Sequence, residues 1–142
     1  MVQESYDTWI FSDVELNICA RMLGYPDWYR VHVGEDQEPL EKRMLDGFLS
    51  LLEKNLLSAE GNAFVPTEKM RTLMSPLMDP DEIIREDGTE RNSLFFRKKG
   101  KSLMRLEKME TEEHSFRLYF VPETEMTDMI SQEDEVKEDG IN

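Results

Sequence analysis

Hydrophobic residues recur at a helical spacing soon after the start of the chain. The apolar positions on this face are Val14, Ile18, Cys19, Met22 and Leu23. Ser12 and Glu15 match a capping box, in which the serine accepts from an early backbone N–H and the glutamate bonds back to the cap residue. Gly24 suits the left-handed residue that often follows a helix. The pattern therefore predicts a helix over residues 13–23.

The clearest helical pattern lies further along the chain and predicts a second helix over about residues 39–55. Its apolar stripe consists of Leu40, Met44, Leu45, Phe48, Leu51 and Leu52. Polar residues occupy the remaining positions, as in an amphipathic helix with one buried face. We expect this stripe to lie in the core, with Phe48 at its centre.

Between these helices, residues 25–37 form a connector with a candidate short strand near 29–33. After the second helix, the strand-like segments 56–58 and 63–65 flank a Gly-Asn turn, which predicts a small hairpin. Thr67 is a candidate cap for a third helix that ends near residues 79–80. A hairpin next to a capped helix is typical of winged-helix modules.

The periodicity changes after residue 80. Alternating or β-rich segments predict strands at 93–97, 102–107 and 116–120, after Ile83 and Ile84. A short helix is expected from about residue 124, and the acidic residues 133–142 read as a flexible tail. We therefore expect an α+β fold: N-terminal helices with a winged-helix-like hairpin, then an antiparallel β-meander and a short C-terminal helix. Residues 1–132 would form one domain.

The chain is strongly acidic, with 31 Asp and Glu residues against 17 Lys and Arg residues and a net charge of −14. Such a surface repels nucleic acid and anionic membranes. The segment 91–108 is the exception, because it holds seven basic residues and one acidic residue, Glu107. This basic hairpin is either a docking surface for an acidic partner or is neutralised by the acidic tail.

Little in the sequence indicates catalysis. Cys19 lies on an apolar helix face and reads as a buried small hydrophobic residue, while His32 and His114 lie in unrelated contexts. Cys and His residues show no metal-ligand spacing, and isolated glycines form no phosphate-binding loop. We expect no enzyme activity, no cofactor and no metal. The absence of a signal peptide pattern and of a long apolar segment predicts a cytoplasmic protein.

Protein binding is the remaining class of function. The candidate protein-binding residues are basic, flexible or apolar residues of the meander and the C-terminal segment: Arg97, Lys98, Lys99, Lys101, Met104, Phe116, Leu118, Phe120, Met126 and Met129. Methionine side chains suit adaptable binding surfaces. The strand at 114–121 carries only one fixed charge, Arg117, and we expect it to form an unprotected sheet edge that joins two copies as a homodimer.

A DNA-binding winged helix would offer basic or amide side chains from its recognition helix. The third helix offers Lys69, Arg71 and Thr72, with Glu68 beside them. That is a weak set for phosphate contact, so we expect the module to build a core or bind protein.

The order of elements resembles the EspG family of type VII secretion chaperones. The segments that carry the resemblance are WIFSDVELNICARMLG, LLSAEGNAFVP, LMSPLMDPDEII, SLFFRKKGKSLMRLE and FRLYFVP, over roughly residues 12–121. The resemblance implies a cytoplasmic, non-enzymatic chaperone that keeps the helical ends of secretion substrates soluble. The chain matches only one half of that family's two-part architecture, which is a second reason to expect a homodimer. It lacks the Trp-x-Gly signature of the secreted substrates themselves.

The leading hypothesis is therefore a non-enzymatic cytoplasmic adaptor or chaperone for a protein partner, with a type VII secretion substrate as one candidate. The alternatives are a winged-helix transcriptional regulator and an acidic, immunity-type inhibitor. A small enzyme would need a cleft that gathers carboxylates or the two histidines.

Overall fold

The computed structural model describes residues 8–28, 30–87, 92–110 and 112–121. The expected helix from residue 124, the acidic tail at 133–142, and Met126 and Met129 lie outside the described residues. Within the described part, the chain has the expected α+β fold, with helices and an antiparallel sheet. None of the described helices is long and apolar enough to cross a membrane.

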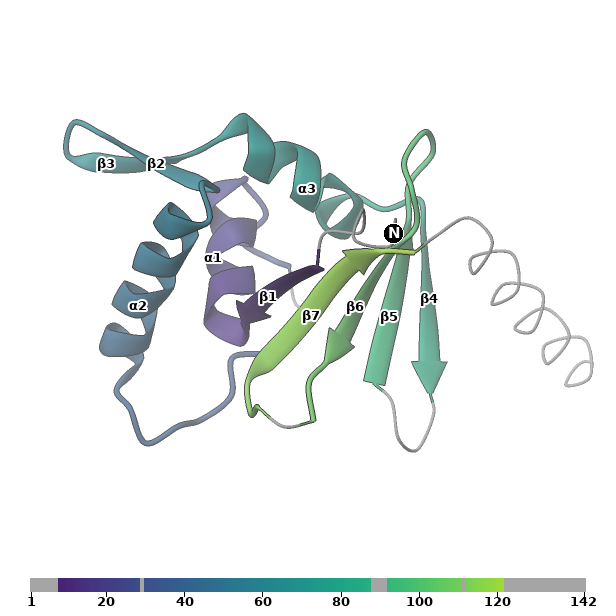
Figure 1. Ribbon diagram of the computed structural model, residues 1–142, viewed down its shortest axis with the longest axis horizontal. Helices are drawn as coiled ribbons and strands as arrows, with labels where there is room; N and C mark the ends of the chain where they lie inside the picture. The colour runs from purple at the N-terminus through teal and green to yellow at the C-terminus, as the bar shows by residue number, and fades with distance from the viewer. Residues whose placement is uncertain (1–7, 29, 88–91, 111, 122–142) are drawn as a thin grey trace, which may run out of the picture.

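Ten elements follow one another along the described chain (Figure 1). They are β1 (Thr8–Ser12), α1 (Asp13–Met22), α2 (Leu40–Glu53), β2 (Leu57–Glu60), β3 (Ala63–Pro66), α3 (Glu68–Met78), β4 (Glu82–Asp87), β5 (Asn92–Arg97), β6 (Met104–Lys108) and β7 (Ser115–Phe120). The three helices, the β2–β3 hairpin and the meander all fall close to the segments that the sequence pattern predicts. Residues 30–33 form no strand, and β1 was not predicted.

Strand β1 changes the expected sheet. The five strands are ordered β1-β7-β6-β5-β4, and every neighbouring pair is antiparallel. Trp9 pairs with Leu118, and Phe11 pairs with Phe116. The expectation of β7 as an unprotected edge was therefore wrong, because β1 and β6 occupy both of its sides. β7 offers no open edge to a second copy.

The main core lies between the sheet and two helices, α1 and α3. Its fully buried residues include Phe11, Leu16, Met74, Phe96 and Leu118. A smaller apolar cluster of Phe95, Leu103 and Val121, with Ile84 packed against it, forms separately from the main core. In Figure 1, α3 lies above the sheet, α1 lies to the left of β1, and α2 stands beyond α1, away from the strands.

Both helices of the core begin at the caps that the sequence predicts. The Ser12 hydroxyl accepts from the backbone N–H of Glu15, and the Glu15 carboxylate accepts from the N–H of Ser12. The Thr67 hydroxyl accepts from the N–H of Met70. Such caps satisfy the unpaired donors of a first helical turn. The capping box on α1 also fixes the point at which β1 ends.

Candidate protein-binding surface on α2 and the β2–β3 hairpin

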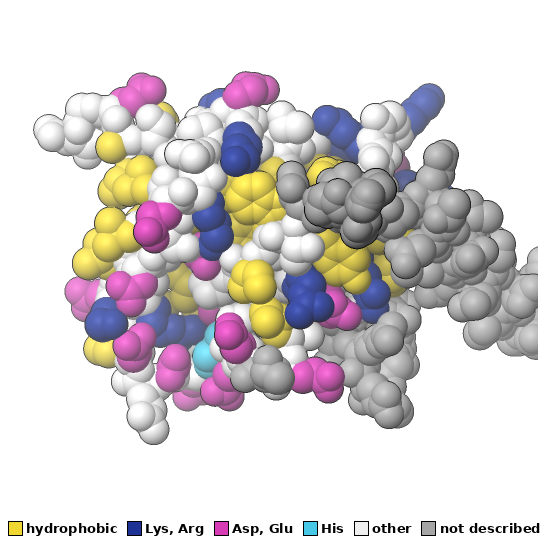
Figure 2. Space-filling model, in the orientation of Figure 1, with side chains coloured by type: hydrophobic (Ala, Val, Ile, Leu, Met, Phe, Trp, Pro, Cys, Tyr) yellow, Lys and Arg dark blue, Asp and Glu magenta, His cyan; other side chains and the backbone are white. Residues whose placement is uncertain are grey.

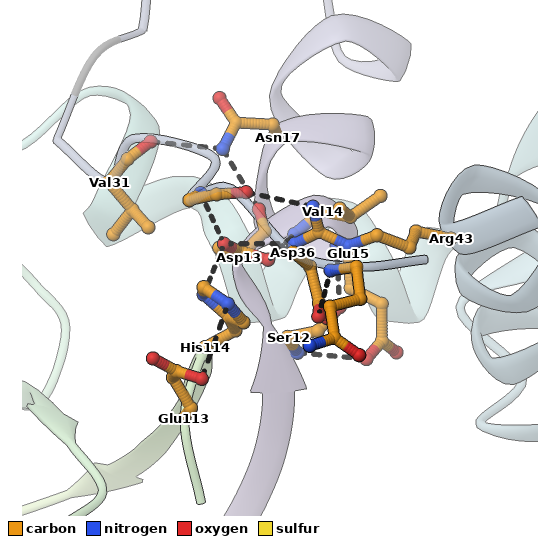
Figure 3. A network of polar contacts seen from close by, with 12 residues as sticks. Ser12, Asp13, Val14, Glu15, Asn17, Val31, Asp36, Arg43, Glu113 and His114 are labelled. Carbon is orange, nitrogen blue, oxygen red and sulfur yellow. Dashed lines mark hydrogen bonds and ion pairs between the residues drawn. The ribbon is translucent and has the colours of Figure 1, made fainter. Parts of the chain in front are cut away.

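Helix α2 is held against α1 by a network of polar contacts (Figure 3). The buried carboxylate of Asp13 accepts from the backbone N–H groups of Val14 and Gly34, each at 2.7 Å. The Arg43 guanidinium of α2 donates to the same carboxylate at 3.1 Å, and its side chain is only 10% exposed. One carboxylate therefore joins the start of α1, the loop at residue 34 and the first half of α2.

A second carboxylate binds the far end of α2 in the same way. One oxygen of Glu15 accepts from the N–H of Ser12 in the capping box. The other accepts from the Ser50 hydroxyl at 2.7 Å and from the Lys54 ammonium group. Lys54 also lies 4.8 Å from the centre of the Phe11 ring. The side of α2 that carries Arg43, Ser50 and Lys54 therefore faces α1.

A glycine lets the two helices approach closely between these contacts. A Cβ atom on Gly47 would lie 3.0 Å from the Cδ1 atom of Ile18, tighter than ordinary packing. Leu51, one turn further along, is fully buried. Gly47 and Leu51 are the buried residues of α2.

The expected buried stripe of α2 was therefore wrong in part. Leu40 is 52% exposed and Leu45 is 56% exposed, and the other large exposed side chains here are Met44, Leu49 and Phe64. Phe48 and Leu52 are partly buried. The polar contacts to Asp13 and Glu15 turn the helix so that the flank of its apolar stripe faces solvent. Figure 2 shows hydrophobic side chains in yellow along the left margin, where α2 lies in Figure 1.

The β2–β3 hairpin extends this apolar surface. The ring of Phe64 stacks on the ring of Phe48, with 5.2 Å between their centres and 17° between their planes. We call Leu40, Met44, Leu45, Leu49 and Phe64 the α2–hairpin surface. Exposed apolar residues gathered on one face mark interaction sites more often than scattered ones do. This surface can bind an apolar face of another molecule.

Charges around the α2–hairpin surface are mainly negative. Lys42 lies 2.9 Å from Glu38 and 3.2 Å from Asp46, and these two carboxylates raise the pKa of its ammonium group. Glu41, Glu53 and Glu60 are exposed. Within the described ranges, these three glutamates make no ion pair.

A polar cleft of about 310 Å³ lies where α2 faces the start of α1. It gathers carboxylates, as a small enzyme would need, and its lining includes Asp13, Glu15, Asp36, Glu38, Asp46, Glu113 and His114. The Nδ1 atom of His114 lies 3.3 Å from Asp13. His32, by contrast, is exposed and does not line this cleft. The two buried carboxylates of the cleft serve the helix contacts described above, which accounts for their burial.

The basic hairpin lies at the other end of the molecule. Lys98 lies 3.3 Å from Asp79, Arg97 lies 3.0 Å from Glu82, and Asp81 accepts from the backbone N–H of Lys99. The corner between α3 and β4 therefore neutralises part of the hairpin. The side chains of Lys99 and Lys101 are exposed and form no ion pair with any described residue.

The remaining predicted site residues are placed differently. Met104 and Leu118 are fully buried in the core, so their expected role in a binding surface was wrong. Leu118 lies in the core between the sheet and the helices, and β1 pairs with the second side of β7. Phe116 and Phe120 are partly buried against the same core.

Two groups beyond the surface, the buried Cys19 and the partly buried Tyr119, have shifted pKa values. Burial raises the pKa of the Cys19 thiol to about 12, and the nearby negative charge of Glu15 adds to this rise. Burial also raises the pKa of Tyr119, whose hydroxyl lies 2.9 Å from Arg105. Both groups stay protonated at neutral pH, and neither is poised as a nucleophile or a base.

Comparisons with protein-family models, with curated proteins and with solved structures found no match.

Proposed function

We propose that this chain is a non-enzymatic adaptor or chaperone that binds a protein partner through the α2–hairpin surface. A single observation carries this proposal. A helix that is tied to the fold by buried ion pairs presents Leu40, Leu45 and Leu49 to solvent. A helix kept only for stability would bury these side chains, since each buried leucine contributes about 1.5–3 kcal/mol.

The resemblance to EspG chaperones adds a client and a place of action to this proposal. The client would be a type VII secretion substrate with an aggregation-prone helical end, and the place would be the cytoplasm. This client class rests on the order of elements alone.

Site-specific photocrosslinking in the native host tests the proposal. A photoreactive amino acid replaces Leu45 or Leu49 in one pair of variants and Ile10 in a control, because Ile10 is also exposed but lies on β1. We expect the same crosslinked protein from both α2 positions and none from position 10. Crosslinking at position 10 but at neither α2 position would overturn the proposal.

A loss-of-contact variant completes the test. Leu45→Ser/Leu49→Ser removes two exposed apolar side chains and should abolish capture of that crosslinked protein. Ile10→Ser serves as the matched control and should leave capture unchanged. Circular dichroism of each purified variant confirms that the helices are retained.

A winged-helix regulator is the second candidate function. Its supporting observation is the β2–β3 hairpin that leads into α3, a helix whose Lys69 and Arg71 are exposed. Both cations contact the chain itself: Lys69 lies 4.9 Å from the centre of the Trp9 ring, and Arg71 lies 4.0 Å from Glu68. These contacts favour the adaptor over the regulator.

A further inference from the structure

The α2–hairpin surface has the shape that suits a second helix. Leu45 and Leu49 lie one helical turn apart, as do Leu40 and Met44. Residues spaced by four form ridges that pack into the grooves of a facing helix. Leu40 and Leu49 point to opposite sides of the helix, so the exposed ridge runs from Glu41 through Leu45 and Leu49 to Glu53, about 18 Å at the helical rise of ~1.5 Å per residue. That length matches about three turns of a partner helix, and Phe64, stacked on Phe48, borders the ridge on the hairpin side.

Three carboxylates beside this surface have no ion-pair partner among the described residues, whereas the nearby cations are all paired. Among the basic residues of α2 and its end, Arg43 binds Asp13, Lys54 binds Glu15, and Lys42 lies between Glu38 and Asp46. Glu41 and Glu53 on α2 and Glu60 on the hairpin make no ion pair with any residue in the described ranges. The whole chain adds a net charge of −14. The charges around the α2–hairpin surface that lack an ion-pair partner among the described residues are therefore negative.

The same charges oppose a second copy as the occupant. A twofold pairing would place the same patch of each copy against the other, so Glu41 and Glu53 would face a surface equally rich in carboxylates. Two chains of −14 each would also repel one another over a distance of about 8–10 Å at moderate salt. A partner with basic residues beside its apolar face gains from each of these charges instead.

We propose that the partner segment is an amphipathic helix with an apolar face flanked by Lys or Arg residues. This inference rests on the proposed function and specifies the chemistry of the client. The partner helix lies along α2, its apolar side chains contact Leu45, Leu49 and Phe64, and its basic flanks approach Glu41 and Glu53. Apolar contact supplies most of the affinity, and the charges select the partner and speed its association.

Fluorescence anisotropy with three labelled peptides tests this inference on the full chain. The first is an amphipathic helix with a leucine face and lysine flanks, the second carries glutamate in place of each lysine, and the third is a scrambled form of the first. At about 50 mM NaCl, where screening is weak, we expect the lysine helix to bind about tenfold or more tightly than the glutamate helix. The scrambled peptide, with equal charge and no apolar face, should bind at least as weakly as the glutamate helix.

Two pairs of variants separate the contribution of apolar contact to peptide affinity from the contribution of charge. Leu45→Ser/Leu49→Ser should abolish binding of the lysine helix, whereas Ile10→Ser should not change it. Glu41→Lys/Glu53→Lys should remove most of the preference for lysine over glutamate. The single reversal Asp27→Lys, at an exposed carboxylate in the loop after α1, should leave that preference within about twofold, because Asp27 belongs to neither α2 nor the hairpin.

Four results would overturn the inference, and they point to different occupants. Equal binding of both charged helices would leave the surface as a protein-binding site and remove the charge selection. Binding of the scrambled peptide as tightly as the lysine helix would reduce the interaction to general attraction of cations. Self-association that Leu45→Ser/Leu49→Ser abolishes would identify a second copy as the occupant. No binding of any peptide would exclude a basic helix, and the crosslinking experiment would then decide the proposed function separately.

Discussion

At the scale of single residues, Asp13 joins segments that are far apart in the sequence. Its carboxylate accepts from Val14, from Gly34 and from Arg43 of α2, and it lies beside His114 near the start of β7. Asp13 is 1% exposed. A buried carboxylate with this many donors is favourable only while all of them are present, because each donor offsets part of the cost of removing the charge from water. Asp13 therefore controls how α2 sits on the fold.

We predict that Asp13→Ala lowers the free energy of unfolding by about 3–5 kcal/mol, the usual cost of leaving a buried ion-pair partner alone. Chemical denaturation measures the loss. Asp27→Ala is the control, since Asp27 is an exposed carboxylate in a loop and its removal should cost within about 0.5 kcal/mol. A loss of less than about 1 kcal/mol for Asp13→Ala would mean that Arg43 finds another partner or water.

We predict that Cys19 does not react with a thiol reagent in the folded protein at pH 8. The side chain is fully buried, and burial raises the pKa of its thiol to about 12, so the reactive thiolate is scarce. A colorimetric thiol assay should show no reaction in buffer and one reactive thiol in denaturant. Rapid reaction in buffer would show that α1 opens locally.

The raised pKa of the Cys19 thiol makes the folded state less stable as the pH rises through the alkaline range. The pKa in the folded state is raised above its ordinary value, so the folded chain holds the proton after the unfolded chain has released it. The contribution of the protonated Cys19 thiol to the free energy of unfolding is fully present below the pKa of the unfolded thiol, near 9. It is lost as the pH rises toward 12. We expect Cys19→Ala to reduce the fall in stability over this alkaline range, as measured by denaturation at several pH values.

The sequence predicts some of these residues and not others. The capping box of Ser12 and Glu15 is local, so its two members are visible from their spacing. Two partners of Asp13, Gly34 and Arg43, lie 21 and 30 positions away along the chain, and no local pattern links them to it. The second role of Glu15, as acceptor from Ser50 and Lys54, is equally invisible to spacing.

At the scale of elements, α2 shows that an amphipathic helix does not always bury its whole apolar face. Its 3.6-residue pattern predicts a helix, and the helix forms at Leu40–Glu53. The pattern does not say which part of a wide apolar stripe meets the core. Gly47 and the polar side chains beside it determine the contact with α1, and this leaves Leu45 and Leu49 in solvent. The candidate surface is therefore found only once the orientation of the helix is known.

A pair of leucines on this helix tests that orientation. We predict that Leu51→Ala lowers the free energy of unfolding by about 2–5 kcal/mol, as expected for a fully buried leucine. Leu45→Ala should change it by within about 0.5 kcal/mol, because its side chain is exposed and alanine favours helix. Thermal and chemical denaturation of both variants measure the difference. Equal losses would place Leu45 in the core, and the α2–hairpin surface would not exist.

For strand β7, the sequence predicts the element but not its neighbours in the sheet. Strict alternation over residues 116–120 predicts a strand with one buried face, and Leu118 is fully buried as expected of such a face. Alternation carries no information about which strands lie beside it. The apolar start of the chain forms β1 and pairs with β7, an arrangement that requires a contact over about a hundred residues. Such long-range pairing lies beyond any local pattern.

At the scale of the whole molecule, charge and shape place the candidate functions on different surfaces. The basic hairpin and the α2–hairpin surface belong to opposite ends of the fold in Figure 1. Partial neutralisation of Arg97 and Lys98 by the α3–β4 corner leaves Lys99 and Lys101 exposed. Net charge was available from composition, whereas the separation of these two surfaces required the fold.

Binding of nucleic acid distinguishes the proposed adaptor from the winged-helix regulator. We predict no tight binding of duplex DNA, because a chain of net charge −14 repels the phosphate backbone at long range. The basic residues of α3 do not offset this repulsion: Lys69 lies over Trp9, and Arg71 lies beside Glu68. A mobility-shift assay with mixed-sequence duplexes at about 50 mM salt gives DNA its most favourable condition, since attraction to phosphate falls steeply as salt rises. We expect no shifted band at micromolar protein. A shift that Lys69→Ala/Arg71→Ala abolishes and Leu45→Ser/Leu49→Ser leaves intact would establish α3 as a recognition helix, and the protein would then be a regulator rather than an adaptor.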